Sequence, residues 1–117
     1  MKTPNAVAAL AALAQDNRLD IFRLLVQAGP DGMAAGQVAN KLGLAPNTLT
    51  FHFDRLRVAG LVTVRRDGRS MIYAAHYETM NGLLAFLTEN CCQGAPASCA
   101  PVECKPTRSA REKERIA

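Results

Sequence analysis

Four cysteines lie close together near the carboxyl end of this chain of 117 residues. They are Cys91, Cys92, Cys99 and Cys104, and the 90 residues before them contain no cysteine. A disulfide framework usually spreads its cysteines so that they join distant elements. The grouping therefore favours local ion-binding or redox chemistry, and we expect a protein of the reducing cytoplasm.

The spacing of these cysteines favours a pyramidal site of three sulfurs. Cys91 and Cys92 are adjacent, and Cys99 follows after six residues that include Gly94 and Pro96. Six residues allow the chain to fold back and bring a third sulfur to the pair. Thiolates are soft ligands that select soft ions. As(III) and Sb(III) take three sulfurs and keep a lone pair in the fourth direction, whereas two thiols suffice for methylarsenite. We therefore expect As(III) as the ligand, or Sb(III) or a trivalent organoarsenical.

Other thiol functions stay open at this point. Structural zinc sites need four ligands in a tetrahedron, usually from two C-x₂₋₄-C pairs. The spacing from Cys99 to Cys104 fits that pattern, but the adjacent pair does not. Adjacent cysteines also rarely form an unstrained disulfide. Binding of zinc, cadmium or copper(I) and thiol redox sensing remain alternatives, and Cys104 is a fourth ligand, a spare thiol or unused.

Basic residues concentrate in the middle of the chain. Residues 41–73 carry six basic and two acidic side chains, and residues 74–104 carry three acidic and no basic ones. Residues 105–117 carry five basic and two acidic side chains. A basic stretch is an electrostatic footprint for nucleic acid, although a solvated surface also accounts for it unless a DNA-reading element lies there.

Hydrophobic periodicity predicts five helices, over residues 5–14, 17–28, 35–42, 46–58 and 77–90. Asn17 is the expected N-cap of the second helix, and Gly43 is the expected C-cap of the third. Two segments alternate like strands around an Asp67-Gly68 hairpin turn, namely residues 61–66 and 69–75. Two short helices joined by a tight turn and followed by a basic hairpin are typical of a winged helix-turn-helix. The predicted fold class is mainly α with a small β-hairpin, in the order α-α-α-α-β-β-α.

Residues 46–58 have the two faces that a DNA-recognition helix needs. Leu49, Phe53 and Leu56 recur at i, i+4 and i+7 and are predicted to be buried. His52 borders that face, so a buried structural role is an alternative to a DNA contact. The opposite face and the hairpin supply the side chains suited to base edges, thymine methyl groups and phosphates, which are Asn47, Thr48, Thr50, Phe51, His52, Arg55, Arg57, Arg65, Arg66 and Arg69.

The stretch from Leu42 to Val62, LGLAPNTLTFHFDRLRVAGLV, resembles the signature of the ArsR/SmtB family of metalloregulatory repressors. It has that family's Leu-Gly turn, a Thr-x-Ser-x-His-like recognition helix and an Ala-Gly-Leu-Val entry to the wing. The resemblance covers about residues 5–90, including DNRLDIFRLL at 16–25. It implies a homodimer, paired through the first and last helices, that represses double-stranded operator DNA until an ion binds. Ala45 and Thr50 stand where the family usually has Ser, and Phe51 stands where it usually has a polar residue. These differences affect which operator sequence we expect the protein to recognise.

The resemblance also bears on the ion. One arsenic site of the family is a Cys-x-Cys pair before the recognition helix, and residues 33–42 contain no cysteine. The family's zinc site on the last helix needs an Asp-x-His and a later His, and only His76 is near. A Cys-Cys pair and a third cysteine after the last helix resemble a subset of arsenic-responsive members, with Cys91, Cys92 and Cys99 in those places.

These observations predict three segments. Residues 1–90 form a DNA-binding and dimerisation domain, residues 91–104 form an ion-sensing segment, and residues 105–117 form a basic, disordered tail. No apolar run reaches 18 residues and no cleavage site stands out, so neither a membrane span nor a secretory signal is expected. We do not expect an enzyme, because no His, Asp or Arg accompanies the cysteines as an arsenate reductase would require. A metal-trafficking protein and a ligand-independent DNA-binding protein are remaining alternatives.

Overall fold

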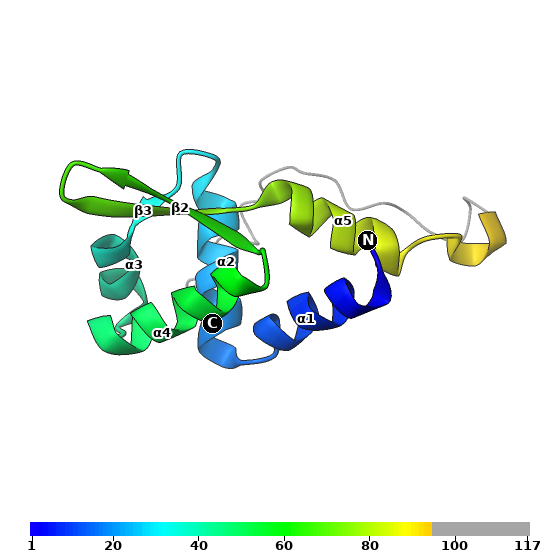
Figure 1. Cartoon of the computed structure of the whole chain (residues 1–117), viewed down its shortest axis with the longest axis horizontal. Coiled ribbons are helices and arrows are strands. Elements are labelled where there is room, and N and C mark those ends of the chain that lie inside the picture. Colours follow the sequence, from blue (N-terminus) through cyan, green and yellow to red (C-terminus); the bar gives the residue numbers. More distant parts are fainter. Residues whose placement is uncertain (95–117) are drawn as a thin grey trace, which may run out of the picture.

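The structure, a computed structural model, describes residues 1–94, which form five α-helices and a three-stranded antiparallel sheet (Figure 1). The elements are α1 (Thr3–Leu13), α2 (Asp16–Ala28), β1 (Met33–Ala34), α3 (Ala35–Leu42), α4 (Pro46–Val58), β2 (Val62–Asp67), β3 (Ser70–Ala75), α5 (Tyr77–Leu87) and a 3₁₀ turn, Cys91–Gly94. The predicted fold class, mainly α with a β-hairpin wing, is confirmed.

The sheet contains one strand that the sequence did not predict. β1 is two residues long and pairs antiparallel with β3, which gives the strand order β1-β3-β2. Met33 lies opposite Tyr73, and Ala34 lies opposite Ile72. Two residues are too few to show a period of two, so only the tertiary pairing reveals this strand. β1 joins the start of α3 to the wing that β2 and β3 form.

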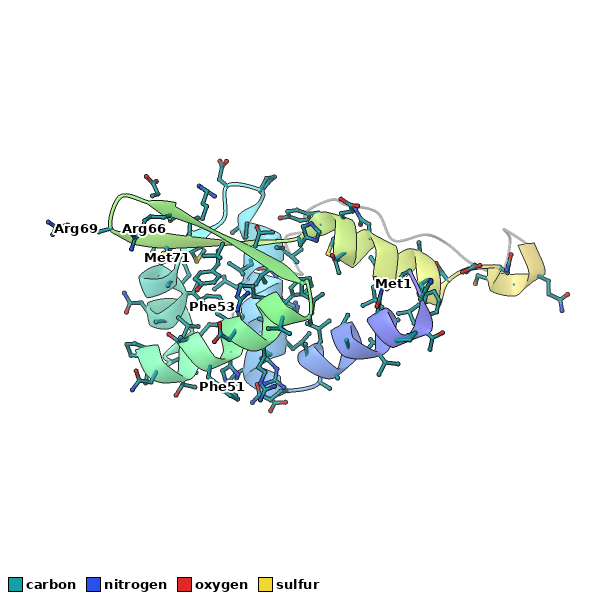
Figure 2. The ribbon with its side chains drawn as sticks, viewed as in Figure 1. Met1, Phe51, Phe53, Arg66, Arg69 and Met71 are labelled. Carbon is teal, nitrogen blue, oxygen red and sulfur yellow. The ribbon has the colours of Figure 1, made fainter. Side chains whose placement is uncertain are left out.

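The turn at the tip of the wing is displaced by one residue from the predicted position. Asp67 pairs with Ser70, so the two loop residues are Gly68 and Arg69. Gly68 has a φ of 63°, as expected for two-residue hairpin loops with glycine in the first loop position. Arg69 consequently lies at the outer end of the wing (Figure 2).

Three helix boundaries also differ from the predicted ones. α1 begins earlier because Pro4 fits the first turn of a helix, where a missing N–H costs nothing. Gln15, rather than Asn17, caps α2, because its side chain accepts a hydrogen bond of 3.0 Å from the backbone N–H of Arg18. α5 ends at Leu87 instead of residue 90, where Asn90 has a positive φ of 57°.

The core is built almost entirely from aliphatic side chains and two phenylalanines, Phe22 and Phe53. α1 contributes only small residues, and the largest fully buried side chains come from α2, α3, α4 and the start of the wing, namely Ile21, Leu25, Val38, Phe53, Leu56 and Leu61. The predicted inward face of the fourth helix is therefore confirmed. No helix within residues 1–94 is long and apolar enough to cross a bilayer.

Other apolar residues of α1 and α5 lie outside this core. The two helices pack side by side at the end of the molecule opposite the tip of the wing (Figure 1). Val7 and Leu10 on α1, and Leu84 and Leu87 on α5, are between 42% and 57% exposed. This end of the molecule thus presents an apolar surface to solvent.

Candidate nucleic-acid interface

The turn between α3 and α4 sets the angle of the candidate recognition helix. Gly43 ends α3 in the left-handed conformation, with φ 66° and ψ 33°, as predicted for a C-cap. The backbone N–H of Leu44 donates to the carbonyl of Ala39 at 3.0 Å, which closes the turn. α4 then begins at Pro46, and no side chain caps it because Ala45 has no polar group. Three residues therefore separate the helices.

The buried face of α4 fixes the helix against the wing. Leu49, Phe53 and Leu56 are at most 3% exposed. The ring of Phe53 stacks on the ring of Tyr73 in β3, with a centroid distance of 3.6 Å and an interplanar angle of 2°. The recognition helix and the wing are consequently held as one unit.

His52 is a buried residue of α4, as the structural alternative for it predicts. It is 6% exposed, and its Nδ1 lies 3.5 Å from a guanidinium nitrogen of Arg18. Arginine has only donors, so Nδ1 is the acceptor and the proton of the neutral ring is on Nε2. Burial, and secondarily the positive charge of Arg18, lower the pKa of His52 below its ordinary value of 6.5. The burial of His52 favours the structural role over a DNA contact.

Arg18 joins three helices at this point. Its Nε donates to the carbonyl of Ala12 at the end of α1 at 2.6 Å, and its guanidinium reaches His52 of α4. Sequence reasoning missed this residue. Its spacing could have indicated this role, because Arg18 precedes Ile21 and Leu25 by three and seven residues and therefore lies on the same, inward face of α2.

The remaining predicted residues of α4 share the solvent-exposed face. They are Asn47, Thr48, Thr50, Phe51, Arg55 and Arg57. The hydroxyl of Thr50 donates to the carbonyl of Pro46 at 3.0 Å. Arg57 makes an exposed ion pair of 3.5 Å with Asp54, a pair that contributes little to stability at such exposure. Arg55 lies over the ring of Phe51, with its Cζ 5.1 Å from the ring centroid.

The wing supplies the other predicted cations. Arg65, Arg66 and Arg69 are exposed, and they lie on β2 and at the tip of the hairpin. Figure 2 shows Arg66 and Arg69 toward the outer end of the wing. Cations on an extended hairpin and on an exposed helix face suit a polyanion that spans both elements.

A groove of about 700 Å³ separates α4 from the second half of α1. Alanines line the α1 side, and arginines, an aspartate and apolar residues line the other. The lining residues are Ala8, Ala11, Ala12, Arg18, Phe51, Asp54, Arg55, Arg57, Val58 and Ala59. The exposed residues of α4 are thus accessible along much of the helix.

Comparisons with known proteins identify the class of protein that carries such a surface. The pattern of a family described as "Helix-turn-helix domain" matches residues 13–65. The HTH-type transcriptional regulator YgaV of Escherichia coli is 31% identical over 87 residues, which are 74% of this chain and 86% of that protein. The chain is a helix-turn-helix transcriptional regulator with a winged-helix fold.

Two further relatives of this regulator agree with that assignment. Nodulation protein NolR of Rhizobium meliloti is 34% identical over 80 residues, and the match spans 68% of this chain but only 63% of NolR. A solved structure of a homodimeric winged helix-turn-helix DNA-binding domain from Mycobacterium bovis, described as a possible ArsR-family regulator, is 28% identical. Its TM-score is 0.61, and the match covers 73% of this chain and 76% of that one. Since these relatives are transcriptional regulators, the chain is not an enzyme.

The cysteine pair of this regulator lies just beyond α5. Cys91 and Cys92 are exposed free thiols in the 3₁₀ turn, and their Sγ atoms are 3.3 Å apart. No group of three or more His, Cys, Asp or Glu side chains suited to a metal ion occurs within residues 1–94. Cys99, Cys104 and the predicted tail at 105–117 lie outside the described residues.

Proposed function

We propose that this regulator is a homodimeric repressor that leaves its operator when As(III) binds the thiolates of Cys91, Cys92 and Cys99. Trivalent antimony and methylarsenite belong to the same ligand class. The observation that carries the proposal is the adjacent pair of exposed thiols, 3.3 Å apart, directly after α5. A regulator of this kind acts on DNA, which agrees with the cytoplasmic location expected from the sequence.

The distance between the two sulfurs suits a pyramidal ligand. With bonds of about 2.3 Å, the length of a zinc–thiolate bond, sulfurs at tetrahedral angles stand about 3.8 Å apart, and sulfurs at right angles about 3.3 Å apart. The separation of 3.3 Å in the Cys91–Cys92 pair corresponds to the second arrangement. A lone-pair ion with three sulfur ligands has angles of that kind. The adjacent pair and Cys99 offer the three sulfurs that As(III) takes, whereas a structural zinc site needs four ligands.

Homodimerisation is supported by the apolar surface on α1 and α5. Val7, Leu10, Leu84 and Leu87 are all exposed there, and burying such side chains in a second copy removes apolar area from water. The M. bovis relative is described as homodimeric. In a symmetric dimer, one patch pairs with its own copy. The two α4 helices then lie on either side of the two-fold axis.

The same arrangement explains how an ion would act at a distance. Repression needs two recognition helices spaced to enter successive major grooves, about 34 Å apart. Ligation of Cys99 onto Cys91 and Cys92 pulls on the end of α5, the helix at the proposed dimer interface. A changed dimer angle misplaces both α4 helices. A coupling of about 1–3 kcal/mol is typical of such systems.

Fluorescence anisotropy tests this function directly. The reduced protein is bound to labelled DNA from its own upstream promoter and titrated in parallel with sodium arsenite, zinc chloride and hydrogen peroxide. We expect release by arsenite alone. Cys91→Ser and Cys99→Ser should bind DNA normally but ignore arsenite, while the matched control Ser98→Ala should respond like the unaltered chain. Normal release from the two cysteine variants would refute the proposal.

Thiol redox sensing is the second candidate, since Cys91 and Cys92 are exposed free thiols. It predicts release by peroxide, reversal by a dithiol reductant and no need for arsenite. Release by zinc, cadmium or copper(I) instead would keep the fold and the DNA-binding role and replace the ion.

A further inference from the structure

An aromatic ring and a guanidinium group form a pair on the exposed face of α4. Phe51 is 52% exposed, and the Cζ of Arg55 lies 5.1 Å from the centroid of its ring. Residues i and i+4 are neighbours on a helix surface, and a guanidinium over an aromatic ring is attracted by the electron-rich face of the ring quadrupole. Within residues 1–94, Arg55 makes no salt bridge, so the ring is what orients it.

The pair is braced from behind by buried residues. The ring of Phe51 meets the ring of His52 edge-on, with centroids 5.6 Å apart and an interplanar angle of 63°. His52 is in turn buried and held next to Arg18. Phe51 itself lies on the side of α4 that faces away from Phe53 and the sheet (Figure 2). One face of the pair is therefore fixed, and the other is open to a ligand.

Few other groups on this face compete for base edges. The hydroxyl proton of Thr50 is engaged with the carbonyl of Pro46, and Arg57 is paired with Asp54. Beyond the first turn of α4, Phe51 and Arg55 are consequently the side chains best placed to enter a major groove.

The chemistry of the two groups defines what they recognise. Arginine reads guanine through bidentate hydrogen bonds to O6 and N7, and phenylalanine makes apolar contact with the C5 methyl group of thymine. Neighbouring base pairs are stacked about 3.4 Å apart along the duplex. A ring and a guanidinium held 5.1 Å apart can therefore address neighbouring base pairs at the same time.

We infer that Phe51 and Arg55 together read a C5 methyl group and a guanine on adjacent base pairs of each operator half-site. Phe51 contacts the methyl group, and Arg55, oriented by the ring, takes the O6 and N7 atoms of the guanine. A 5-methylcytosine carries the same methyl group and satisfies the same contact. This inference rests on the proposed role of α4 in DNA binding and adds the sequence that it reads.

Selection of bound duplexes from a randomised pool first shows whether the unaltered protein enriches a thymine and a guanine on adjacent base pairs. The selected duplex is then remade with deoxyuridine in place of that thymidine, which removes only the methyl group. We expect the affinity to fall roughly 4-fold, the value for one buried methyl group. Replacement of the thymidine by 5-methylcytidine, with a matching guanine opposite, should retain more affinity than replacement by cytidine. Equal affinity for thymidine and deoxyuridine duplexes would overturn the inference.

Two variants separate the partners. Phe51→Gln should bind thymidine and deoxyuridine duplexes equally while still preferring the guanine. Arg55→Gln removes the guanidinium that contacts O6 and N7, so its preference for the guanine should fall by about 5- to 150-fold. Gln27→Ala, altered at an exposed residue of α2 outside this interface, is the control and should select the same sequence as the unaltered chain. Arsenite release should be unchanged in all three, so failure here is distinguishable from failure of the proposed repressor function. Variants that select the unaltered sequence would refute the pairwise reading.

Discussion

The ring of Phe53 on α4 lies flat against the ring of Tyr73 on β3, with the centroids 3.6 Å apart. This contact connects the two elements that would touch DNA, the recognition helix and the wing. It also lies in the centre of the core, because Phe53 is only 2% exposed. The positions of the reading residues therefore depend on packing that is remote from the DNA surface.

Loss of this stack should be costly. Phe53→Ala is expected to lower the free energy of unfolding by about 3–5 kcal/mol, since a buried aromatic side chain is replaced by a cavity. Phe51→Ala, in the same helix but exposed, should change it by less than about 0.5 kcal/mol. Urea denaturation followed by circular dichroism at fixed protein concentration measures both. Equal losses in the two variants would contradict the packing described here.

The buried His52 should make stability fall in mild acid. Its pKa is below 6.5 in the folded chain and near 6.5 in the unfolded chain, so the unfolded state takes up the proton first as the pH falls. The free energy of unfolding should consequently decrease as the pH drops below about 6.5, with a slope of at most about 1.4 kcal/mol per pH unit, until the folded pKa is passed.

The variant His52→Gln isolates this contribution. Its free energy of unfolding, measured by urea titration between pH 7.5 and pH 5, should lack the part of the slope that the unaltered chain shows below pH 6.5. Parallel curves for the two proteins would mean that His52 does not titrate differently in the folded and unfolded states.

The apolar surface of α1 and α5 should control the oligomeric state. Leu84→Asp places a charge among exposed apolar residues of α5 and is expected to convert the proposed dimer to a monomer with weaker operator binding. Met71→Asp, on the wing and 39% exposed, is the control and should stay dimeric. Light scattering coupled to size exclusion gives the mass of each. A dimeric Leu84→Asp protein would place the interface elsewhere.

Two glycines near β1 should respond oppositely to the same substitution. Gly32 has a φ of 76°, and a Cβ there would collide with the backbone carbonyl of Tyr73. Gly32→Ala should therefore destabilise the protein by about 1–3 kcal/mol, whereas Gly36→Ala, in α3 with open space around it, should be neutral or stabilising by up to about 1 kcal/mol. Thermal denaturation compares the stability of the two variants. Unchanged stability of Gly32→Ala would show that the backbone at Gly32 does not pack closely against Tyr73 of β3.

Much of this fold could be predicted from the spacing of hydrophobic residues and from the residues that end helices and form turns. The inward triad Leu49, Phe53 and Leu56 follows from a spacing of 3.6, and the cap at Gly43 from the need for a left-handed residue. The shift of the wing turn could not be predicted, because Asp67-Gly68 and Gly68-Arg69 both place glycine in the loop and only strand register chooses between them.

The candidate site was predicted less completely. Exposed residues of α4 and the wing followed from the helix face and the hairpin, but His52 sits at the border of two faces, and only its contact with Arg18 assigns it to the interior. The exposed apolar residues Val7 and Leu84 belong to helix faces that one chain alone does not cover. Sequence spacing gives their periodicity but not which neighbour buries them.

Measuring arsenite affinity with and without DNA shows whether As(III) binding and operator binding oppose each other. Coupling between two binding sites is reciprocal, so an ion that weakens DNA binding must itself bind more weakly to the DNA complex by the same factor. Equilibrium dialysis of arsenite against the reduced protein, alone and saturated with operator duplex, gives that factor. We predict one arsenic per chain and an affinity about 5- to 150-fold lower on DNA. Equal affinities, or no arsenic bound, would contradict it.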